Sequence, residues 1–362
     1  MSFSTTPDMP CATDAALPFP MTDPVIDFAH RQTTHCESGA AANMLRHHGL
    51  DLSEPLVFGI GGGLFFGYFP FLRMAHIRVT TFRKAPGAVF NKAMQRLGVP
   101  YRTETFFSKA NARSKMDTLL EAGTPVGLQV GFFWLPYVPR AMRSHFNAHN
   151  LVVYGRRKDT YLISEPGLET VQECDAASLE RARFSKGGMN PRGRMYWITE
   201  KQIPRRPDLR EPIRKGLLDT CHSMLDIPIP ILGVRGIHYQ ARDLRKWGRQ
   251  LPEAQFRHNL NQLLIMQEVV GSGGAGFRFM FAAFLQDAGL ALDNAALAAA
   301  SQRMTAIGDQ WRQFALASTR IIKGRANPGE TVDALADNLA SIAEAEKAEY
   351  IRLRILAKEL KP

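Results

Sequence analysis

The chain has 362 residues, of which 45% are hydrophobic and 22% charged, a balance that excludes intrinsically disordered and fibrous proteins. Its formal net charge of +11 is typical of proteins that contact nucleic acid, an anionic membrane surface or an acidic carrier protein. The basic residues are spread along the chain without an aromatic-interleaved motif, so we expect no nucleic-acid binding. A solvated basic face without a dedicated partner is the alternative explanation.

The four cysteines are scattered, with no C-x-x-C pair and no metal-ligand spacing. This usage indicates a reducing compartment, and we expect a cytoplasmic protein without a metal site. The longest uncharged run, residues 55–72, approaches membrane-spanning length but contains five glycines and two prolines. We therefore expect no transmembrane segment, which leaves peripheral contact as the only mode of membrane binding. Residues 1–24 show no secretory signal and predict a loose arm.

Helical and strand patterns alternate from residue 25 to about residue 200. A helix is predicted from Ser38 to His48, followed by a Gly/Phe-rich loop over residues 58–68. Helices are then expected at 86–97 and 111–122, and strands at 77–82, 101–106, 125–130, 148–155, 160–164 and 195–198. The strand at 195–198 is expected to close the sheet. This order of elements predicts an α+β domain.

The composition changes at residues 201–207, a proline- and charge-rich linker. Beyond it the pattern is almost entirely helical, with helices expected at 213–224, 241–249, 253–270, 276–288, 294–318 and 331–360. We therefore divide the chain into a flexible arm (1–24), a catalytic domain (25–202) and a helical domain (203–362).

Three residues suggest nucleophilic catalysis. Cys36 lies at the start of the first predicted helix, where free N–H groups and the helix dipole favour a thiolate. His149 opens a predicted strand, and Glu165 follows the next strand. Nucleophile, base and orienting carboxylate thus occur in chain order.

Each residue of this set also has a plainer interpretation. Cys36 can be a small buried core residue, and His149 an ordinary strand histidine. Asn150 competes with Glu165 as the residue that orients His149. As the neighbour of His149 on a strand, however, Asn150 should point to the opposite face.

Several segments resemble a known family. The run His35-Cys36-Glu37-Ser38, with Leu52-Ser53-Glu54-Pro55 and the glycine-rich residues 58–64, resembles the N-terminal domain of the butirosin-biosynthesis H protein family. Residues 271–286, with Trp311 and Phe314, are similar to the helical region that accompanies this domain. The resemblance covers roughly residues 25–340. It implies a papain-like cysteine-enzyme fold, in which an N-terminal helix packs on an antiparallel sheet, followed by an all-helical domain.

The resemblance also implies an activity. The family's founding member transfers an acyl group from an acyl carrier protein to an amine, through a cysteine-linked acyl-enzyme. By this resemblance Cys36 is the nucleophile and His149 the base, and Glu165 stands where papain-like enzymes usually have Asp-Pro. The implied partners are an acidic acyl carrier protein and a small-molecule or lipid acceptor. No resident cofactor is expected, because 4'-phosphopantetheine arrives on the carrier protein.

Acyl transfer through Cys36 requires an oxyanion site and a dry pocket. The backbone N–H of Cys36 is one expected oxyanion donor, and the side-chain amide of Gln32 is a second candidate. Apolar residues that we expect to line the substrate site, unless they are plain core, are Phe58, Gly61, Gly62, Phe65, Phe66, Phe132 and Trp134. The glycine run at 271–276 lacks a P-loop lysine; close helix packing is its expected use, and binding of a phosphate is the alternative.

Two other functions fit the same residues. The first is a cysteine peptidase, or an amide or thioester hydrolase, that uses the Cys-His-Glu set. The second is a non-catalytic binding module with a basic surface. The acyl chain, the acceptor and the oligomeric state do not follow from the sequence.

Overall fold

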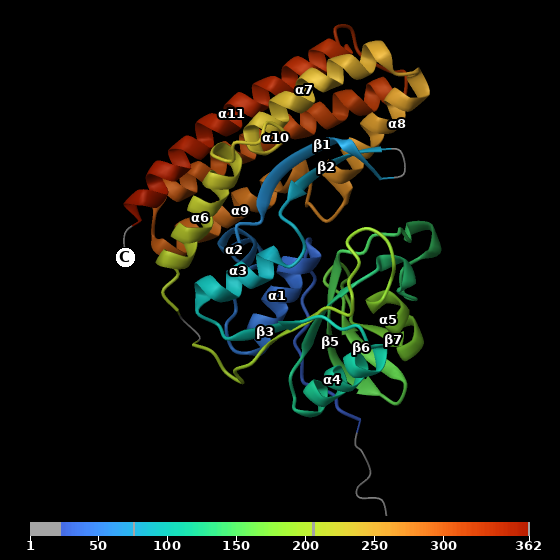
Figure 1. The fold of residues 1–362 in the computed structure, drawn as a ribbon. Coiled ribbons are helices and arrows are strands. Elements are labelled where there is room, and N and C mark those ends of the chain that lie inside the picture. Colours follow the sequence, from blue (N-terminus) through green and yellow to red (C-terminus); the bar gives the residue numbers. More distant parts are fainter. Residues whose placement is uncertain (1–22, 75–76, 205–206, 361–362) are drawn as a thin grey trace, which may run out of the picture.

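A six-stranded antiparallel sheet forms the centre of one half of the protein (Figure 1). The computed structural model describes residues 23–74, 77–204 and 207–360, so almost all of the predicted arm lies outside the described residues. The strand order is β3-β8-β4-β5-β6-β7. The strands are β3 (Tyr101–Glu104), β4 (Val126–Val130), β5 (His149–Arg157), β6 (Thr160–Ser164), β7 (Gln172–Asp175) and β8 (Met195–Ile198).

Helix α1 (Cys36–His47) packs against the central strands β4, β5 and β8. Residues 37–45 of α1 are all buried, and the small side chains at 40–42 let the helix approach the sheet closely. Three further helices complete this half, and α4 and α5 pack on the sheet from the side away from α1. They are α3 (Ala88–Leu97), α4 (Lys109–Glu121) and α5 (Ala176–Arg183). The fold is the α+β arrangement that the sequence predicted, with the helix that follows the nucleophile lying on an antiparallel sheet.

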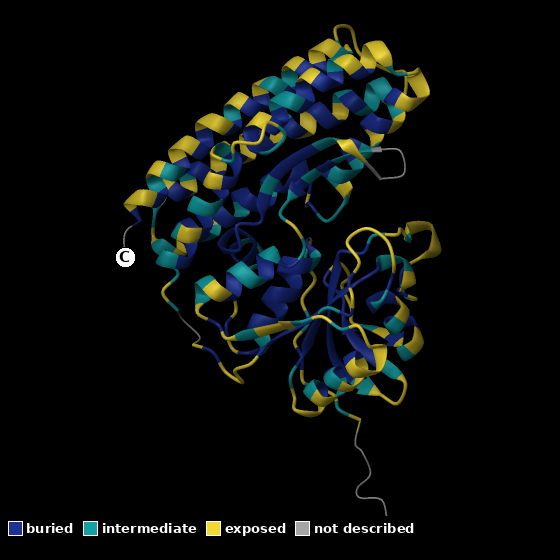
Figure 2. Cartoon of the chain, in the orientation of Figure 1, coloured by how far each residue is buried: buried dark blue, intermediate teal, exposed yellow. Residues whose placement is uncertain are grey.

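The second half is a layer of helices with their buried faces turned toward one another (Figure 2). Two 28-residue helices, α10 (Ala295–Ile322) and α11 (Val332–Glu359), run along it and contact each other. The other members are α6 (Arg210–Leu225), α7 (Gly233–Gln250), α8 (Glu253–Leu264) and α9 (Arg278–Leu292). A π-helical turn, Ile265–Val269, extends α8. None of the described helices is long and apolar enough to cross a membrane.

Residues 54–83 lie between the sheet half and the helical layer (Figure 1). The predicted loop at 58–68 is wrong, because these residues form the end of α2 (Glu54–Ile60) and the start of β1 (Leu64–Met74). β1 pairs with β2 (Ile77–Arg83), while α2 packs on α9 and α6, and β1 packs on α7. The aromatic side chains of this segment suit a buried strand. The sequence predicted a loop because its glycines are typical of loops. A segment of the predicted catalytic domain is thus embedded among the helices.

A carboxylate in α6 joins the two halves electrostatically. Asp219 accepts hydrogen bonds from Lys84 at 2.8 Å, Lys92 at 2.7 Å and Arg96 at 2.9 Å. Burial alone would raise the pKa of Asp219, but these three cations lower it to about 2. The carboxylate therefore stays ionised, and it fixes β2 and α3 to the helical layer across the physiological pH range.

The sheet differs from its prediction in two places. β7 and α5 were not expected, because residues 172–183 show neither a clear alternation nor an apolar stripe. β8 does not close the sheet but lies between β3 and β4. All four of its residues are buried, as an interior strand requires.

The helical layer contains a fully buried ion pair. Arg278 of α9 donates to Glu346 of α11 from Nε at 2.7 Å and from Nη2 at 3.0 Å, and both side chains are 0% exposed. Trp311 Nε1 donates to the same carboxylate at 2.6 Å, and Arg278 Nη1 donates to the carbonyl oxygen of Gly276 at 2.7 Å. The pair thus ties α9, α10 and α11 to the glycine run that precedes α9.

Replacing Glu346 by alanine should lower the free energy of unfolding by about 3–5 kcal/mol, because it leaves a buried guanidinium uncompensated. The matched control is Glu344→Ala in the same helix. Glu344 is exposed and pairs with His238 at 2.7 Å, so its loss should cost no more than about 1 kcal/mol. Chemical denaturation of both variants measures the difference. Equal losses would contradict a structural role for the buried pair.

Candidate active site

The structure brings Cys36, His149 and Glu165 together. Cys36 is the first residue of α1, His149 is the first residue of β5, and Glu165 directly follows β6. His149 Nε2 lies 2.9 Å from both carboxylate oxygens of Glu165. The imidazole and the Cys36 thiol shift each other's pKa as close neighbours, and Cys36 Sγ lies 4.0 Å from the carbonyl oxygen of Ala148, the residue before His149.

Electrostatics in this set favour a thiolate beside an imidazolium. Burial alone would raise the pKa of Cys36, but the hydrogen bond and positive charge of His149, with the charge of Arg83, bring it below its ordinary value. Burial alone would lower the pKa of His149, yet the charge of Glu165 and the bond to Cys36 raise it to about 10. The pKa of Glu165 is lowered in spite of burial, chiefly by the charge of His149. Between the pKa values of Cys36 and His149 the nucleophile is therefore ionised.

Two stretches of backbone fix the distance between the thiol and the carboxylate. The segment before Cys36 lies along the turn that carries Glu165, and Thr33 N donates to Pro166 O at 2.7 Å. The imidazole of His30 reinforces this contact, at 2.8 Å from Ser164 Oγ and 2.9 Å from Leu168 O. Residues more than 130 positions apart are thereby held in register.

Two further groups position the set and were not predicted. Tyr137 donates from its hydroxyl to Glu165 Oε2 at 2.9 Å, and burial with the nearby carboxylate raises its pKa, which keeps it a donor. Glu54 of α2 accepts from the backbone N–H groups of Thr34 at 2.9 Å and His35 at 2.6 Å. Both depend on contacts distant in sequence, so no local signal marked them.

Asn150 does not orient His149. Its Nδ2 lies 3.9 Å from Cys36 Sγ, and its Oδ1 accepts from Tyr196 at 3.1 Å. The Asn150 amide therefore faces the sulfur, on the α1 side of the sheet. Glu165 occupies the orienting position, and Asn150 is placed to donate to charge that develops near the thiol.

The predicted oxyanion donor Gln32 is exposed, and its Nε2 donates to Gly167 O at 3.3 Å. This bond adds to the contact between the segment before Cys36 and the turn after β6. The oxyanion role of Gln32 stays a prediction. The Cys36 backbone N–H lies in the first turn of α1, where a helix leaves its N–H groups free of intrahelical partners.

The residues predicted to line a substrate site separate into two groups. Phe132 contacts the catalytic set, with its ring centroid 4.9 Å from that of His149, and Trp134 is 37% exposed nearby in the same turn. The others lie in α2, in the turn after it and in β1; Phe65 is half-buried, whereas Phe58, Gly61, Gly62 and Phe66 are buried. These buried residues have no free surface to offer a ligand and serve the core.

The glycine run of the helical half lies beside the nucleophile segment. A Cβ at Gly273 would meet Thr34 Cγ2 at 3.3 Å, and the His35 ring lies edge-on to Phe277, with centroids 5.2 Å apart. Gly276 has a φ of +55°, and a Cβ there would lie 2.2 Å from the Phe82 ring. This close packing is the use that the sequence indicated for the run, and it makes the helical half part of the wall around Cys36.

Two family models match separate parts of this chain. Residues 35–166 match the family model of butirosin biosynthesis protein H, N-terminal, and this match encloses all three candidate catalytic residues. Residues 177–353 match the family model described as domain of unknown function DUF4872. A search of curated proteins found no match.

One similar solved structure is described as a C39-like peptidase from Bacillus anthracis. It is 13% identical, with a TM-score of 0.34, and the match covers 49% of this chain and 98% of that chain. Similarity at this level says nothing about the reaction of this chain. Among the described residues, no group of three or more His, Cys, Asp or Glu side chains could hold a metal ion.

Alkylation of Cys36 by iodoacetamide should stay fast below the ordinary pKa of a cysteine and fall as the pH drops through the lowered value. His149→Ala should move this profile to higher pH, because the imidazole would no longer counteract burial, which raises the pKa of Cys36. Cys174 and Cys221 are internal controls, since burial raises the pKa of each to about 12. Peptide mass spectrometry assigns the rate to each thiol. Superimposable profiles for the two proteins would refute the pairing of Cys36 with His149.

The two candidate orienting residues can be separated by titrating His149 by NMR. Glu165→Gln should lower its pKa clearly from about 10, because Glu165 is the largest of the causes that raise it. Asn150→Ala should change it much less, since that amide faces Cys36 and Tyr196. The opposite order of effects would assign the orienting role to Asn150.

Proposed function

We propose that the chain is a biosynthetic acyltransferase that uses Cys36 as its nucleophile, because residues 35–166 match the family model of butirosin biosynthesis protein H, N-terminal. The observation that carries the proposal is the Cys36–His149–Glu165 set, in which His149 and Glu165 are buried, Cys36 is half-buried and the thiol has a lowered pKa. A nucleophile held next to a base that a carboxylate orients is what acyl transfer through a covalent intermediate requires.

In the first step of the proposed reaction, the Cys36 thiolate attacks the carbonyl carbon of an acyl thioester. The new C–S bond forms, the thiolate of the carrier leaves, and it takes a proton from the His149 imidazolium. The side-chain amide of Asn150, 3.9 Å from the sulfur, and the first N–H groups of α1 are placed to stabilise the oxyanion. Glu165 holds the imidazole in position throughout.

In the second step an amine or hydroxyl attacks the acyl-enzyme. Neutral His149 accepts the proton of the acceptor, and the Cys36 thiolate leaves. Transfer requires that water be kept from the intermediate. His149 is 8% exposed and Glu165 3% exposed, and the glycine run of the helical half covers the segment before Cys36, which favours transfer over hydrolysis.

An acyl carrier protein is the proposed donor. Carrier proteins are acidic, and the net charge of +11 complements such a partner. The thioester on a phosphopantetheine arm would also supply a leaving group that needs little protonation. Docking driven by charge should weaken as salt is added.

Mixing the protein with acyl-carrier thioesters should add the mass of the acyl group to Cys36, and an amine should then remove it as an amide. Intact-protein mass spectrometry follows both steps. Cys36→Ala should show no adduct, whereas Cys174→Ala should behave as the wild type, because Cys174 is buried with a pKa of about 12. Cleavage of peptides without any transfer would favour a hydrolase. An unmodified Cys36 with every donor would contradict the proposal.

A further inference from the structure

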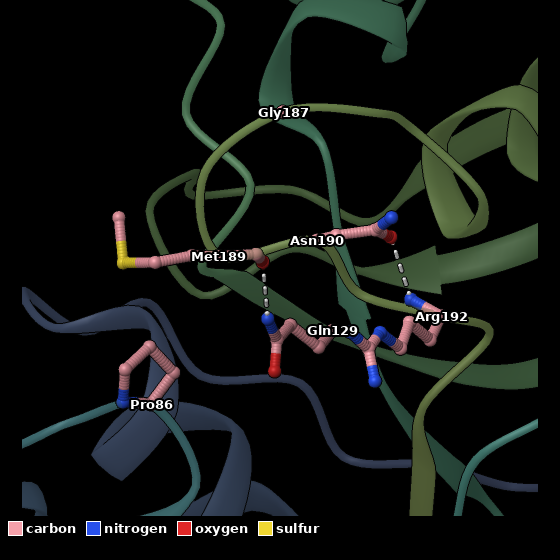
Figure 3. A pocket seen from close by; sticks show the side chains of 6 residues that line it. All are labelled: Pro86, Gln129, Gly187, Met189, Asn190 and Arg192. Atoms are coloured by element: carbon pink, nitrogen blue, oxygen red, sulfur yellow. Dashed lines mark hydrogen bonds between the residues drawn. The ribbon is translucent and has the colours of Figure 1, made fainter. Parts of the chain in front are cut away.

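A cavity of about 400 Å³ opens between two loops of the sheet half (Figure 3). One wall is Pro86, in the connection from β2 to α3, and the other is the segment from Gly187 to Arg192, between α5 and β8. Gln129 of β4 lies at its base, between Pro86 and Met189. None of the residues of the Cys-His-Glu set lines this cavity, so it is a feature separate from the catalytic residues.

The cavity nevertheless adjoins the nucleophile. Gln129 pairs directly with Asn150 across β4 and β5. Residues opposite each other in an antiparallel pair place their side chains on the same face. Gln129, which lines the cavity, and Asn150, whose Nδ2 lies 3.9 Å from Cys36 Sγ, are therefore neighbours on one face of the sheet.

The polar lining of the cavity is cationic and amidic. Arg192 is exposed in its wall, Asn190 lies beside it, and none of the six lining residues is acidic. Arg194 donates to Pro86 O at 3.2 Å and to Gln129 Oε1 at 3.4 Å, two neutral acceptors that belong to the lining of the cavity. The field of Arg83 reaches Cys36 as well, where it lowers the pKa of the thiol. Arg83 pairs with the buried Glu37 at 3.5 Å, so Arg192 is the cation that the lining of the cavity presents.

The loop that carries Arg192 is held in an unusual conformation. Met189 and Arg192 have φ values of +56° and +51°, a region that side chains with a Cβ rarely adopt. Gln129 Nε2 donates to Met189 O at 3.1 Å, and Asn147 Nδ2 donates to Lys186 O at 3.1 Å and Gly188 O at 3.0 Å. Buried side chains thus impose the shape of the loop, which is typical of a binding wall.

We propose that this cavity binds a carboxylate or phosphate group of the small substrate that reacts at Cys36, with Arg192 as its main ligand. A planar guanidinium pairs with either anion through two hydrogen bonds. The inference rests on the proposed function, and it narrows the substrate class to an acyl group or an acceptor that carries an anionic end. The far end of an extended phosphopantetheine arm is not the expected occupant, because the cavity begins so close to the sulfur.

The first test uses thiol chemistry and does not require acyl transfer. 3-Maleimidopropanoate and N-ethylmaleimide modify the same thiol and differ in a carboxylate. For each protein we take the rate of Cys36 modification by 3-maleimidopropanoate divided by the rate with N-ethylmaleimide. This ratio should be roughly tenfold higher in the wild type than in Arg192→Ala, as expected for loss of a charge-assisted pair. Because the ratio is taken within one variant, a general change in thiol reactivity cancels.

The matched control is Arg157→Ala, which removes the same charge at the far end of β5, where Arg157 is exposed and faces Glu173. Its ratio should equal that of the wild type, and Arg192→Lys should retain part of the preference. Equal ratios in wild type and Arg192→Ala would overturn the proposal, even if acyl transfer by Cys36 were established. If the wild type prefers the anionic reagent and Arg192→Ala does not, but no acyl transfer is found, the anion site is supported and the proposed function is contradicted.

A second test separates the two sources of the anion. If the acceptor carries it, Arg192→Ala should raise the concentration of 4-aminobutanoate needed for half-maximal transfer, with little effect for butylamine, and acyl-enzyme formation should be unchanged. If the acyl group carries it, formation of the acyl-enzyme from a succinyl-type thioester should slow by roughly tenfold relative to a butanoyl thioester. If Arg192→Ala changes neither the half-maximal concentration of 4-aminobutanoate nor the rate of acyl-enzyme formation from the succinyl-type thioester, the proposal is overturned.

Discussion

A buried charge pair between His149 and Glu165 is the interaction on which the site depends. An imidazolium in this environment would lose its proton unless a carboxylate compensated it, since burial alone lowers the pKa of His149. The same charge then lowers the pKa of Cys36, against the effect of burial. Ionisation of the nucleophile is therefore set by a carboxylate that binds the base, and Tyr137 in turn holds that carboxylate.

The helical half takes part in the site as well as covering it. Glu54, which starts α2, binds the backbone N–H groups that precede the nucleophile, and α2 packs on the helices of the second half. The His35 ring lies against Phe277, which is followed directly by the buried Arg278–Glu346 pair. The helical layer is thus in contact with the residues that directly precede Cys36. The two matched families occur here as one continuous structure around one site.

Asn150 and its neighbour His149 point to opposite sides of β5 and contact different members of the site. His149 and Asn150 follow each other on β5, yet the imidazole turns to Glu165 while the amide turns to the sulfur and to Tyr196. Successive side chains of a strand point to opposite faces, which allows these two neighbours to have different partners. Asn150 also pairs across the sheet with Gln129, which lines the cavity.

The sequence alone determined the α+β order, most of the helices and strands, and the identity of Cys36, His149 and Glu165 as a candidate set. These follow from local patterns: a cysteine at a helix start, and polar residues at strand ends. Only the tertiary structure decided that residues 54–83 pack among the helices, that Tyr137 and Glu54 support the site, and that Pro86, Gln129 and Arg192 line one cavity. Such contacts join residues far apart in the chain, and neither periodicity nor spacing records them.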